Sequence, residues 1–236
     1  MTATATPTTA RSLQQIAPNV TSKVKDGDLV TAQKGLIGVG VVLALLGYFL
    51  GKHGELSYLV GYMGVLGIAL CALFFTMIQH ITRAGWSVSV RRLAENMTGT
   101  LPFMLLLFIP IIIGFGEIFG HWSHKWNLEK GAEGYDAIIA GKSSYLNPTF
   151  FFVRVAIYFA IWIGLARFFR NQSIKQDETG DPAISMRLSR VAAPGLLLFA
   201  LSITFAAFDW IMSIDPHWFS TIFGITYFAG GFMSFL

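Results

Sequence analysis

Residues 56–81 read LSYLVGYMGVLGIALCALFFTMIQHI and contain no Asp, Glu, Lys or Arg. An α-helix rises about 1.5 Å per residue, so about 20 helical residues cross the hydrocarbon core of a bilayer. This stretch is long enough and apolar enough for that crossing. It therefore predicts a transmembrane helix, and the rest of the chain repeats the pattern.

Four further apolar stretches have the same character: residues 35–50, 101–120, 149–169 and 192–213. A sixth begins near Phe219 and reaches Leu236, where we expect it to be cut off inside a helix. Pro and Gly inside these stretches are tolerated because lipid leaves backbone groups no partners outside the helix. The predicted fold class is an all-α integral membrane bundle. Its predicted parts are a cytoplasmic tail at 1–34, a first five-helix bundle at 35–213, and an outer loop with a truncated sixth helix at 214–236.

Composition excludes several other classes of protein. The chain is 54% hydrophobic and 13% charged, whereas soluble domains carry roughly 25% charged residues. The net charge of +4 is small, and no basic stripe with interleaved aromatic residues indicates nucleic-acid binding. The single Cys71 excludes an intrachain disulfide, an iron–sulfur cluster held by this chain alone, and covalent haem attachment through a C-x-x-C-H motif.

The distribution of Lys and Arg predicts the orientation in the membrane. Twelve of these residues lie in the N-terminal tail, in the connection after residue 81 and in the segment 167–190 between the fourth and fifth stretches. Four lie in the other connections, and Arg154 lies inside an apolar stretch. Residues 1–34 lack the apolar core of a signal peptide. We therefore expect a cytoplasmic N-terminus, with residues 121–148 on the outer side.

Three charged residues lie deep inside the predicted spans rather than at their cytoplasmic ends: Glu117, Arg154 and Asp209. Charges at membrane depth are costly and often functional. The helical rise places all three within about 2 Å of one depth, near the outer face. Two interpretations follow: an ion-pair staple that holds helices together, or a proton-relay or quinone-headgroup site. Under either one, Arg154 should contact at least one of the two acids.

Other polar residues flank the ends of the spans. His121, Asp215 and His217 lie near the same outer level, where such groups are either solvated or functional. His80 ends a span on the cytoplasmic side, with an interfacial hydrogen-bonding role or a proton-entry role. His80 and His121 lie at opposite faces, so they form no depth-matched pair for a b-type haem. No phosphate-binding loop, catalytic triad or metal-binding motif is present, and the sequence predicts neither a catalytic nor a metal site.

Three segments carry a family resemblance: RAGWSVSVRRLAEN (83–96), SSYLNPTFFFVRVAIYFAIW (143–162) and FDWIMSIDPHWFSTIFG (208–224). With the spacing of the apolar stretches, they resemble the NrfD-like membrane subunits of alternative complex III, the second such subunit most of all. That complex is a bacterial quinol:cytochrome c, or high-potential acceptor, oxidoreductase. The resemblance covers residues 35–236. It implies ten helices in two four-helix bundles with flanking helices, of which about six are present here.

The resemblance also implies a function and partners. The chain would be a subunit of the respiratory complex without its own redox centre, a scaffold with a proton-conducting or quinone-binding role for menaquinone or ubiquinone. Its partners would be membrane lipid, a multihaem cytochrome c subunit, an iron–sulfur subunit and a sister NrfD-like subunit in the bacterial inner membrane. Arg154, Asp209, Asp215 and His217 match the family's motifs and would conduct protons on the outer side. The alternative is a stand-alone secondary transporter, which an inverted repeat with broken helices would favour.

Overall fold

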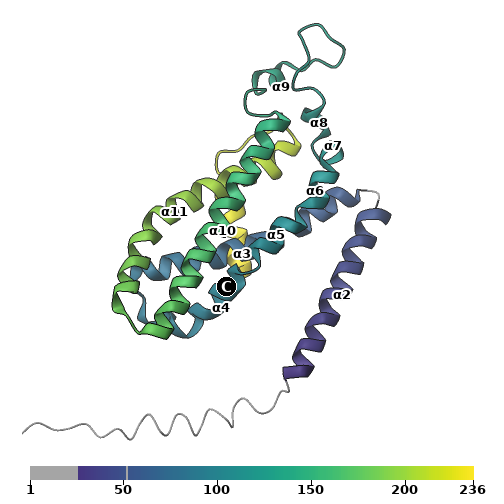
Figure 1. Ribbon diagram of the computed structural model, residues 1–236. Coiled ribbons are helices and arrows are strands. Elements are labelled where there is room, and N and C mark those ends of the chain that lie inside the picture. The colour runs from purple at the N-terminus through teal and green to yellow at the C-terminus, as the bar shows by residue number, and fades with distance from the viewer. Residues whose placement is uncertain (1–25, 52) are drawn as a thin grey trace, which may run out of the picture. The chain divides into compact units, whose positions relative to one another are not determined.

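A computed structural model (Figure 1) describes residues 26–51 and 53–236, and these residues fall into two compact units that divide after Gly54. The described residues form helices and no strand. Among the described residues, four helical segments are long and apolar enough to cross a membrane: Gly54–Thr82, Val90–Ile113, Pro148–Thr179 and Pro182–Ile214. The predicted all-α class of a membrane protein is thereby confirmed.

The first unit contains one described helix, α2 (Asp26–Leu50), whose apolar part runs from Gln33 to Phe49. Of the predicted tail at 1–34, residues 1–25 lie outside the described part of the chain. Residues 26–34 are helical and form the first turns of α2. The assignment of this helix to the first bundle stays a prediction.

The second unit is built around α3 (Gly54–Thr82), α10 (Pro148–Thr179), α11 (Pro182–Trp210) and α12 (Phe223–Phe235). Helices α10 and α11 lie side by side and antiparallel (Figure 1), and α12 packs against α11. Tyrosines of α3 and α12 tie the helices together. The Tyr62 hydroxyl donates to the Met104 carbonyl at 3.0 Å, and the Tyr227 hydroxyl donates to the Met63 carbonyl at 2.7 Å.

A tight turn joins α10 to α11. Gly180 ends α10 with φ of +64°, a left-handed conformation that glycine adopts without strain. The Asp181 carboxylate then accepts the Ala183 backbone N–H, and Pro182 occupies the first helical turn. We call this end of the unit the hairpin end. The opposite end, with residues 119–147 before α10 and 211–222 after α11, is the loop end.

The predicted span 101–120 is a chain of short helices rather than one continuous helix. These are α5 (Leu101–Leu107), α6 (Ile109–Ile113), α7 (Phe115–Ile118) and α8 (Gly120–Ser123). Pro102 and Pro110 each lie at the start of one of them, because proline lacks the N–H that an interior position needs. The connection that follows α3 contains two short helices, η1 (Gly85–Ser87) and α4 (Val88–Thr98).

Aromatic side chains fill the interior of the second unit. Trp162 and Trp210 are fully buried, and the Trp210 ring lies 4.8 Å from Phe108 between ring centroids. Large apolar side chains also cover the outside: Leu106 is 60% exposed and Leu197 is 64% exposed. An apolar core with an apolar exterior suits a lipid environment, since soluble proteins rarely expose large contiguous apolar patches.

Candidate functional site

A buried ion pair joins α10 to α11 at the loop end. Arg154 lies near the start of α10 and Asp209 near the end of α11, so the antiparallel arrangement places them opposite each other. Arg154 Nε donates to Asp209 Oδ2 at 2.7 Å, and Nη2 donates to Oδ1 at 3.0 Å. Arg154 is 6% exposed and Asp209 is 0% exposed. The predicted contact between Arg154 and an acid is confirmed.

Neighbouring groups complete this pair. The Tyr158 hydroxyl donates to Asp209 Oδ2 at 2.7 Å, so the carboxylate accepts three hydrogen bonds in all. Arg154 Nη1 donates to the Tyr145 carbonyl at 2.9 Å, and the guanidinium carbon lies 3.9 Å from the centre of the Tyr145 ring and 4.4 Å from that of Phe150. Both charges are thus compensated, as burial requires. We call Arg154, Asp209, Tyr158 and the Tyr145 carbonyl the buried network.

Glu117 does not join the buried network. It lies on α7 with its side chain exposed, and the described residues give it no ion pair. The predicted triad at one depth is therefore a pair. The rise per residue gives the level of a side chain but not the side of the helix on which it lies. The breaks at Pro110 and Gly114 further change the course of this span.

A cavity of about 450 Å³ opens beside the buried network at the loop end. Ser213 forms part of its wall and donates a hydrogen bond to the Asp209 backbone carbonyl at 2.5 Å. Most of the remaining wall is apolar or aromatic. Its larger side chains are Lys142, Tyr145, Phe205, Phe208, Trp218 and Phe219. Such a wall suits a flat apolar ring with a polar edge.

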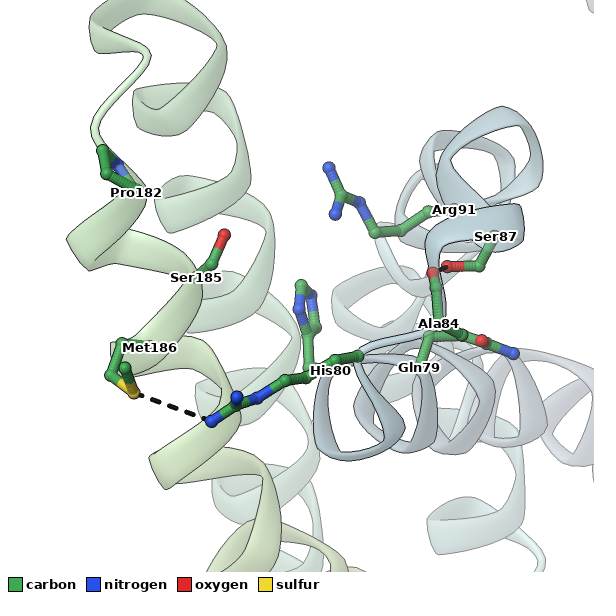
Figure 2. Close-up of a pocket in the computed structure, with 9 residues that line it drawn as sticks. Gln79, His80, Ala84, Ser87, Arg91, Pro182, Ser185 and Met186 are labelled. Atoms are coloured by element: carbon green, nitrogen blue, oxygen red, sulfur yellow. Dashed lines mark hydrogen bonds between the residues drawn. The ribbon is translucent and has the colours of Figure 1, made fainter.

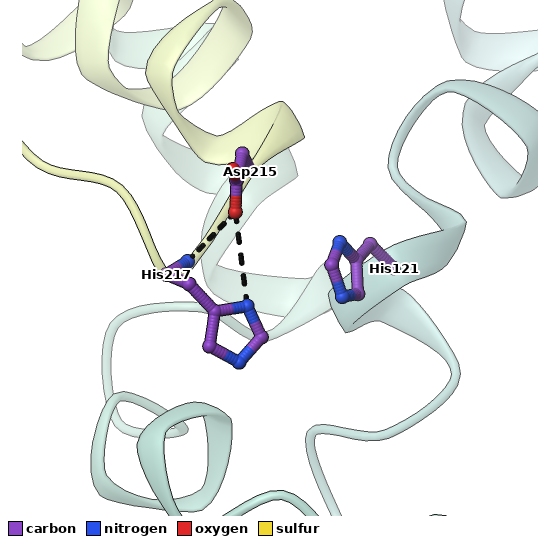
Figure 3. Close-up of side chains that lie close together, drawn as sticks. All are labelled: His121, Asp215 and His217. Atoms are coloured by element: carbon purple, nitrogen blue, oxygen red, sulfur yellow. Dashed lines mark hydrogen bonds and ion pairs between the residues drawn. The ribbon is translucent and has the colours of Figure 1, made fainter.

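Three of the residues that were singled out at the ends of spans come together at the loop end. His121 belongs to α8 (Gly120–Ser123), and Asp215 and His217 follow η2 (Met212–Ile214) (Figure 3). One ligand atom of each lies within 4.8 Å of the others. The His121 and His217 ring centroids are 5.2 Å apart, and His217 Nδ1 lies 3.7 Å from Asp215 Oδ1. All three side chains are exposed.

Residues 136–142 hold this cluster in position. Asp136 caps α9 (Ala137–Gly141) by accepting the backbone N–H groups of Ile138 and Ile139, and its other oxygen lies 2.7 Å from His217 Nε2. Although desolvation opposes the shift, these two amides and the His217 ring lower the pKa of the Asp136 carboxyl. Lys142 Nζ donates to the Pro216 carbonyl at 2.6 Å.

His80 lies at the hairpin end, far along the helices from the other candidates. It lines a cavity of about 300 Å³ with Arg83, Arg91 and Ser185. Figure 2 shows its ring pointing into the space between Ser185 on α11 and Arg91 on α4. The ring stacks on Phe169 at 5.5 Å, and its buried Nε2 has no hydrogen-bond partner within the described residues.

Arg83 stands at the end of α3 with φ of +50°, a left-handed conformation that is uncommon for residues other than glycine. The Ala84 N–H bonds back to the Gln79 carbonyl across this position at 3.2 Å, which closes the helix. The Arg83 guanidinium contacts Met186 Sδ on α11 at 3.8 Å. The guanidinium groups of Arg83 and Arg91 and the imidazole of His80 therefore line one cavity. Such groups can donate charge-assisted hydrogen bonds to an anionic group.

Several residues of these sites were not predicted from the sequence. Tyr158 follows Arg154 by four positions on α10, and residues so spaced share a helix face. That spacing was the available signal. Asp136 precedes a short helix as a capping residue, but its partner His217 is distant in the sequence. The buried Glu95, which pairs with Arg92 at 3.0 Å and with Arg91 at 3.4 Å, was also missed.

Comparison of the sequence with protein-family models and with curated proteins finds no match.

Proposed function

We propose that this chain is an integral membrane subunit of a respiratory quinol:cytochrome c (or high-potential acceptor) oxidoreductase of the alternative complex III type, the second of its NrfD-like subunits. It holds no redox centre of its own. It anchors the multihaem cytochrome c subunit, the iron–sulfur subunit and the sister NrfD-like subunit in the bacterial inner membrane, with its N-terminus cytoplasmic. Haem c and the iron–sulfur clusters belong to those partners.

One observation carries this proposal. Two of the three segments that resemble the family supply the two sides of the buried network. Segment 143–162 contributes Arg154 and Tyr158, and segment 208–224 contributes Asp209. The resemblance thus coincides with the contacts that lock α10 to α11. A motif with such a structural role is expected to persist in a family of membrane scaffolds.

The geometry of the network favours the scaffold over the proton path. A residue that conducts protons must exchange them with water or with a neighbouring carrier. Asp209 is fully buried, and its carboxylate accepts three hydrogen bonds, two of them from a guanidinium. This arrangement stabilises the charged form and the helix pair together. The network therefore supports the staple interpretation.

The cavity beside the network supports a quinone contact as a finer part of the proposal. Its aromatic walls match the ring of menaquinone or ubiquinone, and the Lys142 ammonium in the wall can donate to a quinone carbonyl. Phe205→Trp fills this cavity and should lower quinol oxidation by the complex without loss of assembly. Leu201→Trp, at an exposed position of the same helix, is the matched control. Equal activity of the two variants would exclude quinone binding at this cavity.

The stand-alone transporter is the competing function. Transporter sites usually lie near the membrane midplane on discontinuous helices. Here the buried Arg154–Asp209 pair lies at the loop end of α10 and α11, and each of these is a single helix. Affinity purification of the tagged chain from native membranes, followed by mass spectrometry, distinguishes the two. We expect the haem-binding and iron–sulfur subunits in constant ratio to the chain. A chain that purifies without them would contradict the proposal.

A further inference from the structure

We propose that His121, Asp215 and His217 form a binding site for a divalent transition-metal ion of the Zn²⁺ class. Imidazole nitrogens and a carboxylate oxygen are the ligands that Zn²⁺ takes alongside thiolates. The ligand atoms come from two segments that are distant in the sequence, α8 and the stretch after η2, and converge within 4.8 Å (Figure 3). Three protein ligands leave a fourth tetrahedral position for water.

The orientation of His217 indicates which nitrogen would bind the ion. Its Nε2 lies 2.7 Å from the Asp136 carboxylate, and its Nδ1 faces Asp215 at 3.7 Å. A carboxylate on one ring nitrogen fixes the tautomer, so that Nε2 carries the proton and Nδ1 presents a lone pair. Metal-binding histidines almost always have such a partner on the second nitrogen. Asp136 therefore positions His217 for a ligand on the Asp215 side.

The backbone on both sides of the cluster is also fixed. Asp215 Oδ1 accepts the His217 backbone N–H at 3.0 Å, which holds these two ligands in one turn. Lys142 Nζ secures the carbonyl of the intervening Pro216 at 2.6 Å. Asp136 itself is held by two backbone amides at the start of α9. A site with this much local support needs only small side-chain movements to close on an ion.

His121 completes the set from the opposite side. Figure 3 shows its ring facing the space beside Asp215 and His217. The two imidazole centroids are 5.2 Å apart, a separation that one ion between the rings can bridge. A bound ion would link α8 to the segment before α12. That link would cross the loop end of the unit.

The test measures metal binding by the full chain, purified in detergent with a tag that contains no histidine. Equilibrium dialysis against Zn²⁺ should give one ion per chain for the wild type. His121→Ala and His217→Ala should each abolish that stoichiometric binding. His53→Ala, which removes an exposed histidine outside the cluster, should leave it unchanged. Co²⁺ in place of Zn²⁺ should give the intense visible absorption of a tetrahedral site.

The Zn²⁺ affinity of a variant at Asp136, the residue that positions His217, provides a second test. Asp136→Asn leaves all three ligands in place, and it should weaken Zn²⁺ binding by about 10- to 100-fold, as is usual for the loss of such a partner. Zn²⁺ should also raise the thermal unfolding temperature of the wild type but not of His217→Ala. A wild type without stoichiometric Zn²⁺, or a double variant lacking both histidines that binds as tightly as the wild type, would overturn the proposal. Unchanged affinity in Asp136→Asn would overturn the role assigned to Asp136.

Discussion

Replacing Arg154 by Leu should destabilise the second unit by about 3–5 kcal/mol, the usual cost of removing one partner from a buried ion pair. The structure explains why the cost falls in this range. Asp209 would lose two of its three hydrogen bonds and stay fully buried with an uncompensated charge. The Tyr145 carbonyl would lose its donor as well. The Tyr158 hydroxyl alone cannot replace a guanidinium.

A double-mutant cycle measures this interaction. The three variants are Arg154→Leu, Asp209→Asn and the two combined, each unfolded in detergent and followed by circular dichroism. Adding Asp209→Asn to the Arg154→Leu variant removes the buried charge, so the double variant should recover part of the stability lost in Arg154→Leu. Arg167→Leu removes an exposed arginine from the same helix and should change the unfolding free energy by no more than about 0.5 kcal/mol.

Two results would refute the reasoning. The first is an Arg154→Leu variant that is as stable as Arg167→Leu. The second is a cycle in which the losses from Arg154→Leu and Asp209→Asn simply add, because residues in contact should show a coupling energy of about 0.5–3 kcal/mol. Either result would mean that the pair does not hold α10 to α11.

Three further predictions concern the role of Asp209, the contact between α11 and α12, and the orientation of the chain in the membrane. The number of protons moved per electron, measured in proteoliposomes, distinguishes the two roles of Asp209. For a staple residue, Asp209→Asn leaves this number unchanged. For a proton-conducting residue, Asp209→Asn assembles and transfers electrons normally but moves fewer protons per electron. Gly224→Ala should destabilise by about 1–3 kcal/mol, because the added Cβ would lie 2.6 Å from Thr204 Cγ2, whereas Gly230→Ala meets no atom within 4 Å and should be tolerated. In intact cells, an impermeant thiol reagent should label Glu133→Cys and not Glu178→Cys, both at exposed positions, and the opposite pattern would reverse the predicted orientation.

The helices were predictable where lipid imposes a clear pattern, and less so beyond it. The apolar stretch 149–169 marks α10, but the helix continues to Thr179 through a mostly polar segment that carries no transmembrane signal. In the third span, Pro110 was visible in the sequence, yet whether a proline kinks or divides a helix depends on the neighbours that satisfy the freed backbone groups.

The sites divide in a similar way. Depth along antiparallel helices was enough to predict the contact of Arg154, since Asp209 lies at the matching level of the next helix. Depth was not enough for Glu117, because it carries no information on the direction of a side chain around the helix axis. The cluster of His121 with His217 depends on how residues 119–147 fold over the loop after α11. The hydrophobic periodicity of the sequence does not predict how these two loops pack against each other.

The optical spectrum of material purified through this chain from native membranes tests the central claim most directly. A dithionite-reduced minus oxidised difference spectrum should show haem c in constant ratio to the chain, and added quinol should reduce that haem. The chain expressed alone should be colourless, with no reducible Soret band. Native material that lacks haem c, or a Soret band in the isolated chain, would contradict the account of a scaffold subunit that holds the redox centres of its partners in the membrane.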